Sequence, residues 1–206
     1  VDDGSRDESA SLLANKARTD PRIRLIRRPH QGITAAFNTG LAHCRGDLIA
    51  RMDADDVCMP DRLAAQRAFL ATHPEIGLVS CRVFYQGDAE KNRGFALYVD
   101  WVNGLSAPRA IYNARFIESP LIHPSVMFRR ELVRVHGGYR EGRFPEDYEL
   151  WLRWLDAGVR MAKVDTELLG WRERPGRLSR IDPRYATDAF YRVKTVYLSR
   201  WLATRG

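Results

Sequence analysis

The protein has 206 residues, of which 45% are hydrophobic and 29% charged, and its formal net charge is +7. This balance is typical of a globular protein and argues against a disordered chain, and no run approaches the roughly 20 apolar residues of a membrane span. The positive charge favours an anionic partner, but the basic residues are spread along the sequence. Three cysteines without metal-ligand spacing, Cys44, Cys58 and Cys81, are typical of reduced thiols in a cytoplasmic protein.

Helix and strand patterns alternate in the first half of the chain. Ile33, Phe37 and Leu41 are spaced four apart, which indicates a helix, and Pro60 suits the first position of another. This alternation predicts an α/β fold with a mainly parallel sheet covered by helices. The predicted elements are a helix at 7–19, a strand at 23–26, a helix at 33–44, a strand at 47–52, a helix at 60–73 and a strand at 76–84.

The second half has a looser pattern. Its last segment is a basic, aromatic, amphipathic helix, which either packs on the domain with its cations in water or lies on an anionic membrane. We expect it to pack. The predicted elements are a weak helix at 99–117, a β-prone segment at 123–128, a helix at 145–157, strands at 161–164 and 168–171, and the basic helix at 185–202.

The chain begins with Val-Asp-Asp-Gly-Ser, an acidic turn of the kind that normally follows a buried strand. The first residue is Val and not Met. We therefore expect that the N-terminus is cut and that the first strand or strands of the sheet are missing from this chain. We also expect the chain by itself to be poorly stable and inactive.

Two acidic clusters, Asp2-Asp3 and Asp53-Ala54-Asp55-Asp56, lie at the ends of expected strands. Ligands of open α/β sheets bind at the carboxyl ends of strands, so the two clusters are expected to share one cleft. Carboxylates this close repel one another unless a cation lies among them, and oxygen ligands suit Mg²⁺ or Mn²⁺. The alternatives are an Asx turn for the first cluster and a helix-capping loop for the second.

Five motifs follow one another along the chain: Val-Asp-Asp-Gly-Ser, Asp-Ala-Asp-Asp with Met-Pro-Asp-Arg-Leu behind it, His-Pro-Ser-Val-Met-Phe, Gly-Gly-Tyr, and Glu-Asp-Tyr-Glu-Leu-Trp-Leu-Arg. In this order and spacing they resemble glycosyltransferase family 2, from residue 1 to about residue 172. The resemblance implies the Rossmann-like GT-A fold and an inverting transfer from a nucleotide-diphosphate sugar, most often a UDP-sugar. It also implies a glycan or lipid-linked acceptor, in the synthesis of surface polysaccharide or glycan.

The resemblance implies roles for single residues as well. The acid that matches Asp3 contacts the nucleotide base or ribose, and the one that matches Asp53 lies near the ribose. Asp55 matches the ligand of Mn²⁺ or Mg²⁺, and Asp147 matches the general base. Candidate contacts to the acceptor or the diphosphate are His123, Glu146 and Trp151.

Some of these residues also suit a purely structural role. Glu146 and Asp147 follow a proline and open a predicted helix, where the helix dipole alone favours acids. Trp151 and Trp154 lie among leucines at helical spacing, which is typical of core; we expect core for Trp154 and leave Trp151 open. Phe37 stands where the family often has a basic residue, which argues against a phosphate contact there.

The resemblance divides the chain into the remainder of a nucleotide-sugar-binding half at 1–84, an acceptor-binding and catalytic half at 85–172, and a basic helix at 173–206. The alternatives are a phosphotransferase or phosphohydrolase, a nucleotide-sugar-binding or nucleotidyltransferase-like domain that is inactive as given, and a non-enzymatic nucleic-acid binder. No Gly-x-x-x-x-Gly-Lys-[Ser/Thr] loop and no nucleic-acid recognition motif occurs. We therefore expect no nucleic-acid partner, and a cytoplasmic protein with peripheral contact to the inner face of the membrane as an open option.

Overall fold

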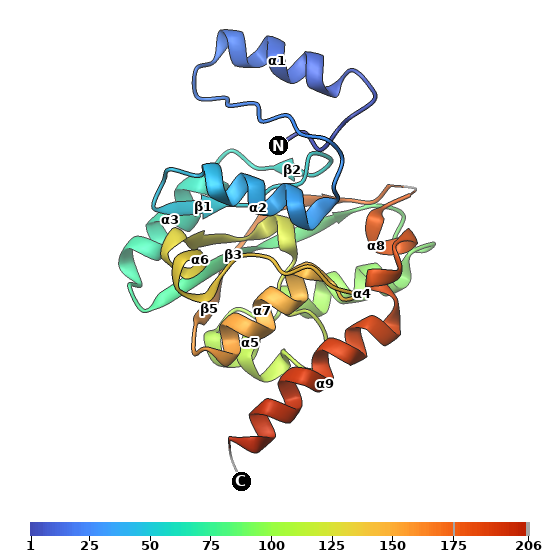
Figure 1. Ribbon diagram of the computed structural model, residues 1–206. Helices are drawn as coiled ribbons and strands as arrows, with labels where there is room; N and C mark the ends of the chain where they lie inside the picture. The colour runs from blue at the N-terminus through green and yellow to red at the C-terminus, as the bar shows by residue number, and fades with distance from the viewer. Residues whose placement is uncertain (175, 205–206) are drawn as a thin grey trace.

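The computed structural model describes residues 1–174 and 176–204 and shows an α/β fold in which one sheet lies among helices (Figure 1). The strands are β1 (Leu48–Ala50), β2 (Val57–Cys58), β3 (Ile76–Gln86), β4 (Met127–Arg129) and β5 (Arg160–Arg172). The α-helices are α1 (Ser9–Thr19), α2 (Ile33–His43), α3 (Arg62–Thr72), α4 (Arg93–Asn103), α5 (Pro108–Ala114), α6 (Arg130–His136), α7 (Glu146–Asp156), α8 (Leu178–Ile181) and α9 (Thr187–Ala203). Two 3₁₀ turns are η1 (His123–Ser125) and η2 (Pro183–Tyr185).

The sheet is mixed. Its strands lie in the order β1-β4-β3-β5-β2. β3 and β5 are parallel, whereas β1 with β4, β4 with β3, and β5 with β2 are antiparallel. The expectation of a mainly parallel sheet is therefore wrong for the described residues. Side-chain alternation in a sequence marks a strand but not its direction, and here the long segment between β3 and β4 returns the chain against β3.

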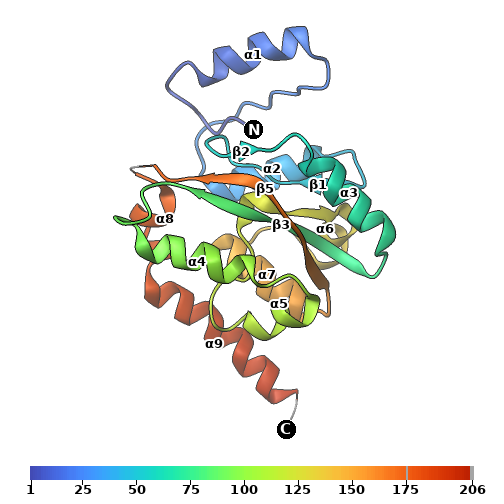
Figure 2. The same cartoon turned by 180° about the vertical axis from the view of Figure 1, so that it is seen from behind.

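Helices cover both faces of the sheet, with α7 in front of it in Figure 1 and behind it in Figure 2. Leu78 of β3 belongs to a buried cluster with Trp154 of α7, whereas the next residue, Val79, packs with Leu70 of α3. Successive strand residues point to opposite faces, so α7 and α3 lie on opposite sides of β3. Trp154 is fully buried with its ring centroid 5.3 Å from that of Phe128, which confirms its place in the core.

Several predicted elements differ from those observed. Residues 23–26 are irregular. The two strands at 161–164 and 168–171 are one long strand, β5, whose pairing with β3 shifts register between them. The weak helix at 99–117 is two helices, because Pro108 starts α5 at its first turn, where proline is tolerated. The interruption between the two predicted strands therefore marks a register shift within β5, whereas the weak helical pattern marks the boundary between α4 and α5.

Two buried side chains of α3 hold two separate loops in a fixed relation. The Arg62 guanidinium donates hydrogen bonds to the carbonyl oxygens of Arg51 at 2.8 Å and Val126 at 3.3 Å. One turn along the helix, the Gln66 amide donates to the carbonyl oxygen of Ser125 at 2.7 Å. Hydrogen bonds that satisfy buried carbonyl groups fix the backbone to which they are made. The loop after β1 and the turn before β4 are therefore anchored to the same helix.

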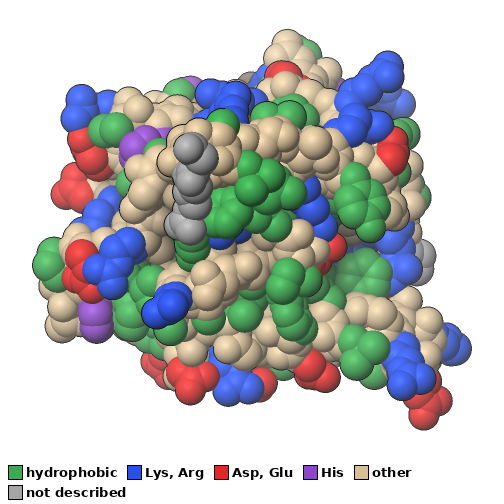
Figure 3. All heavy atoms as spheres, turned by 90° about the horizontal axis from the view of Figure 1, so that it is seen from below, with side chains coloured by type: hydrophobic (Ala, Val, Ile, Leu, Met, Phe, Trp, Pro, Cys, Tyr) green, Lys and Arg blue, Asp and Glu red, His purple; other side chains and the backbone are tan. Residues whose placement is uncertain are grey.

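The basic C-terminal helix packs on the domain, as expected. Val193 and Tyr197 of α9 form a buried cluster with Tyr148 and Leu152 of α7. Seen from below, hydrophobic side chains lie between Lys and Arg side chains on the surface of the molecule (Figure 3). Across residues 1–174 and 176–204, none of the helices combines the length and the apolar character needed to cross a bilayer. The exposed hydrophobic residues of α9 include Tyr191, Leu198 and Leu202.

Candidate active site

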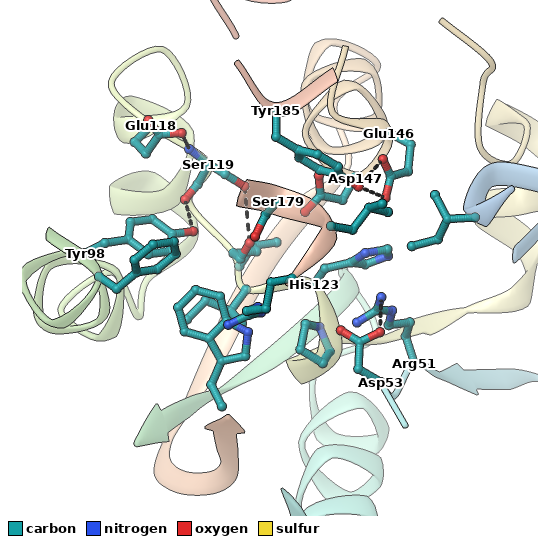
Figure 4. A pocket seen from close by; sticks show the side chains of 18 of the residues that line it. Arg51, Asp53, Tyr98, Glu118, Ser119, His123, Glu146, Asp147, Ser179 and Tyr185 are labelled. Atoms are coloured by element: carbon teal, nitrogen blue, oxygen red, sulfur yellow. Dashed lines mark hydrogen bonds and ion pairs between the residues drawn. The ribbon is translucent and has the colours of Figure 1, made fainter. Parts of the chain in front are cut away.

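One cavity of about 540 Å³ brings together most of the residues that the sequence singles out (Figure 4). It lies between the loop after β1, the turn η1, the start of α7 and the chain that follows β5. These segments are far apart in sequence but meet at one end of the strands, where β1 and β5 finish and β4 begins. The predicted site residues on its wall are Asp53, Asp55, His123, Glu146 and Asp147.

Three carboxylates are clustered in the loop after β1. Asp53, Asp55 and Asp56 each offer an oxygen atom, and these atoms lie within 4.8 Å of one another. Burial, and then the charges of Asp53 and Asp55, raise the pKa of Asp56 to about 6, although the backbone N–H of Arg172 donates to it. The second Asp56 oxygen is buried without a hydrogen-bond partner among the described residues. Crowded, incompletely satisfied oxygen atoms fit a divalent cation such as Mg²⁺ or Mn²⁺.

Two arginines pair with these acids. The Arg51 guanidinium lies 2.6 Å from Asp53, and that of Arg174 lies 3.6 Å from Asp55. Arg51 is only 8% exposed and stacks over the ring of Phe37, with 4.9 Å between its guanidinium carbon and the ring centroid. Sequence reasoning missed Arg51. Phe37 stands where the family often has a basic residue, and in space Arg51 brings a guanidinium group to its ring. The only signal for Arg51 in the sequence was its position just before the acidic loop.

The first turn of α7 presents two acids to the cavity. Burial, and then the neighbouring charge of Glu146, raise the pKa of Asp147 to about 7. The backbone N–H of Tyr148 donates a hydrogen bond to Asp147 at 2.8 Å, and Arg51 also favours its charged form. Glu146 is buried, and the hydroxyl of Tyr185 lies 2.8 Å from each of its oxygen atoms. A carboxyl group that titrates near neutrality is suited to general-base catalysis.

Asp3 lies outside the described wall of the cavity. Its carboxylate accepts hydrogen bonds from the backbone N–H groups of Gln31 and Gly32, and it lies 3.2 Å from the Arg28 guanidinium. Gly32 has a φ of 90° and directly precedes α2, so Asp3 holds a tight turn that introduces this helix. Contact between Asp3 and a nucleotide stays a prediction.

His123 lines the cavity, and Trp151 packs behind it. The Nε2 atom of His123 lies 2.6 Å from the hydroxyl of Tyr139, and burial lowers the pKa of His123 well below its ordinary value. The imidazole is therefore neutral and supplies no positive charge to a diphosphate. Trp151 is 0% exposed and packs edge-on against His123. The candidate acceptor contact of Trp151 is wrong in this geometry, because no part of its ring reaches the surface.

The opposite end of the cavity is aromatic, and sequence reasoning missed it. Phe95 and Tyr98 of α4 lie beside Trp171 at the end of β5, with ring centroids 5.6 and 6.1 Å from that of Trp171. The Tyr98 hydroxyl donates to the carbonyl oxygen of Ser119 at 2.9 Å. Arg177 covers the Trp171 ring at 4.3 Å. Figure 4 shows Tyr98 and Ser119 on the side away from Arg51 and Asp53, so the cavity has an acidic end and an aromatic end.

Comparison with known proteins identifies similar glycosyltransferases. Residues 1–137 match the family model described as Glycosyl transferase family 2. The chain is 30% identical over 170 residues to the amylovoran biosynthesis glycosyltransferase AmsE of Erwinia amylovora. That alignment covers 82% of this chain and 61% of the relative, so this chain spans about three fifths of the relative's length.

Two solved structures share the fold. The S. aureus protein TarS 1–349, in complex with UDP-GlcNAc, has a TM-score of 0.70 and 17% identity, over 95% of this chain and 54% of that chain. The mannosyltransferase PcManGT from Pyrobaculum calidifontis, in complex with GDP-Man and Mn²⁺, has a TM-score of 0.61 and 25% identity. This second alignment covers 85% of this chain and 47% of that chain. The fold is therefore the expected α/β arrangement of the GT-A type.

Proposed function

The chain belongs to glycosyltransferase family 2, and on this premise we propose that it moves a sugar from a nucleotide-diphosphate sugar to an acceptor hydroxyl with inversion at the anomeric carbon. One observation carries the proposal. The acids of the candidate metal site, Asp53 and Asp55, and the candidate base, Asp147, line the same cavity. A single displacement needs a base on the acceptor side and positive charge on the leaving side, and these groups would supply both.

The acidic end is the proposed donor site. Asp55 is the proposed ligand of Mn²⁺ or Mg²⁺, with Asp53 and Asp56 within reach of the same ion. When bound, the ion would offset the charge of the leaving diphosphate. Arg51 brings a guanidinium group to this part of the cavity wall, and guanidinium geometry suits phosphate oxygens. A UDP-sugar is the proposed donor, and the complexes of TarS with UDP-GlcNAc and of PcManGT with GDP-Man and Mn²⁺ support a nucleotide-sugar site of this kind.

The aromatic end is the proposed acceptor site. The carboxylate of Asp147 takes the proton of the acceptor hydroxyl, whose oxygen bonds to the anomeric carbon. The bond from that carbon to the diphosphate breaks at the same time, and the diphosphate leaves with the electron pair. Phe95, Tyr98 and Trp171 would stack on the apolar face of a sugar ring, which suits a glycan or lipid-linked acceptor.

All three parts of the chain contribute to the proposed site. The donor acids lie in residues 1–84 and the base and aromatic wall in residues 85–172, while residues 173–206 add Arg177 and Tyr185 to the cavity wall. The outer side of α9 combines exposed apolar residues with basic ones, which suits the surface of an anionic membrane. We therefore propose a cytoplasmic protein that acts in the synthesis of a surface polysaccharide or glycan, with peripheral contact to the inner face of the membrane as an option for α9.

Metal-dependent binding of a nucleoside diphosphate tests the donor site. Thermal unfolding of the chain is followed with UDP or GDP, each with and without Mn²⁺. A nucleotide at about 100 times its Kd would stabilise the fold by about 2.7 kcal/mol, which corresponds to a rise in Tm of roughly 5–10 °C. We expect this rise only when Mn²⁺ is present, and we expect EDTA to abolish it.

Two variants make the test specific. Asp55→Asn is expected to lose the nucleotide-dependent rise, whereas Asp47→Asn, whose side chain is 98% exposed, is expected to keep it. Equal protection of Asp55→Asn and the unchanged protein would contradict the assignment of the metal site. Protection by nucleic acid without metal, and none by either nucleotide, would contradict the proposed function as a whole.

A further inference from the structure

The glutamate before the proposed base is a buried acid with a partner from a distant part of the chain. Glu146 is 2% exposed and is the first residue of α7. The hydroxyl of Tyr185 lies 2.8 Å from both Oε1 and Oε2, so its proton is donated to this carboxylate (Figure 4). A buried carboxylate is costly to ionise unless such donors stabilise its charge. Tyr185 therefore favours the charged form of Glu146 against the effect of burial.

Residues 182–185, which position the Tyr185 hydroxyl, are held by several contacts. The backbone N–H of Tyr185 donates to the carbonyl oxygen of Asp182 at 3.0 Å, and the Arg184 guanidinium pairs with the Asp182 carboxylate at 2.7 Å. Arg184 also reaches the hydroxyl of Thr34 in α2 at 3.5 Å. Burial, and then the charges of Glu146 and Asp147, raise the pKa of Tyr185 far above its ordinary value. Tyr185 therefore remains protonated at neutral pH, and its hydroxyl acts as a donor.

Charged and titratable groups surround the two acids from several elements. The charge of Glu146 raises the pKa of Asp147. Glu146 accepts the Tyr185 hydroxyl at both of its oxygen atoms, whereas Asp147 accepts one backbone N–H, from Tyr148. The negative charge of Glu146 thus has a side-chain donor of its own directly beside Asp147. The other groups that face the pair are Arg51 from the loop after β1, Tyr98 from α4, Tyr139 from the loop after α6, and Arg184 beside Tyr185 in η2.

We propose that Tyr185 is a positioning residue whose hydroxyl keeps the Glu146 carboxylate charged beside Asp147, and that this neighbouring charge makes Asp147 a stronger base. The inference rests on the proposed function, in which Asp147 takes a proton from the acceptor. A like charge nearby makes a carboxylate bind its proton more firmly. Without the Tyr185 hydroxyl, the charge of Glu146 loses its hydrogen-bond donor, so Glu146 takes up a proton more readily. Asp147 is then ionised over a wider pH range but is a weaker base.

A carboxyl NMR titration tests this without any substrate. The chain is labelled with ¹³C at the aspartate carboxyl carbon, and the Asp147 signal is identified by its loss in Asp147→Asn. We expect Tyr185→Phe to lower the titration midpoint of Asp147 by about one pH unit. Tyr191→Phe removes the hydroxyl of an exposed tyrosine on α9 and is expected to leave the midpoint unchanged. A purely structural role for Tyr185 would lower stability without moving the midpoint.

Glu146→Gln provides a second measurement, which also applies if Tyr185→Phe does not fold. It removes the charge itself, so we expect the Asp147 midpoint to fall at least as far as in Tyr185→Phe. Adding Tyr185→Phe to Glu146→Gln should then lower it no further. An unchanged Asp147 midpoint in Glu146→Gln would overturn the proposal. So would a double variant in which Tyr185→Phe lowers the midpoint as much as it does in the unchanged protein. Because the readout needs no donor, a failure here is distinct from a failure of nucleotide binding.

Discussion

Replacing Asp147 by asparagine is expected to abolish transfer and yet to stabilise the folded protein at alkaline pH. In the cavity the pKa of Asp147 rises from 3.8 to about 7, mainly because the side chain is withdrawn from water. At about 1.36 kcal/mol for each pH unit, ionising it in the folded state costs about 4 kcal/mol. Because the two adjacent acids share this cost, we expect Asp147→Asn to raise the free energy of unfolding by about 2 kcal/mol, or Tm by roughly 4–8 °C.

The effect of Asp147→Asn on the free energy of unfolding depends on pH, and its direction follows from the protons bound by the folded and unfolded states. The unfolded chain releases the Asp147 proton near pH 4, whereas the folded protein retains it up to about pH 7. The folded state therefore binds more protons between these values, and the unchanged protein loses stability as pH rises through them. Asparagine does not titrate, so the variant avoids this loss. The difference in unfolding free energy should be near zero at about pH 4 and largest above about pH 8.

Urea unfolding of both proteins at several pH values measures the difference directly. Asp100→Asn, an exposed position in α4, serves as the control and should show no pH-dependent gain. The variant should still gain stability from a nucleoside diphosphate and Mn²⁺ while showing no transfer. A gain that is the same at acid and alkaline pH would refute the argument from burial, and full transfer by Asp147→Asn would refute its role as base.

Two further predictions concern the acceptor side of the reaction. Tyr98→Ala should raise the KM for the acceptor about tenfold, equivalent to about 1.4 kcal/mol, without changing protection by the nucleotide. Tyr98→Phe keeps the ring but loses the hydrogen bond to Ser119, and should retain the acceptor KM. The transfer rate should fall about tenfold for each pH unit below about pH 7, because protonated Asp147 accepts no proton, and a rate that is constant down to about pH 5 would contradict this.

The part of the site that follows from the sequence is the part built from strand ends and helix starts. Asp53 and Asp55 come directly after a strand, and Asp147 opens a helix, so local pattern and the order of motifs were sufficient to expect them in one cleft. The structure places all three on one cavity wall. Their chemical roles stay predictions, as does the nucleotide contact of Asp3, which lies in a turn beside α2.

The remainder depends on contacts between distant segments. Tyr98 and Tyr185 reach the cavity from α4 and η2, and neither has a sequence neighbour that marks it as part of a site. Strand direction was missed for the same reason, since a single strand pattern is equally compatible with parallel and antiparallel pairing. Trp151 was left open because an aromatic residue one turn from a functional acid suits both core and surface, and only its burial decides between them.

The shared anchor on α3 limits how the loop after β1 can be redesigned. The Arg51 carbonyl, just before the acidic loop, accepts a hydrogen bond from Arg62. The Ser125 carbonyl, in the same turn as His123, accepts one from Gln66, one helical turn further along α3. A loop of different length grafted from a relative would leave buried donors of α3 without acceptors. A loop exchanged between relatives should therefore keep its conformation when the loop and α3 are transferred together.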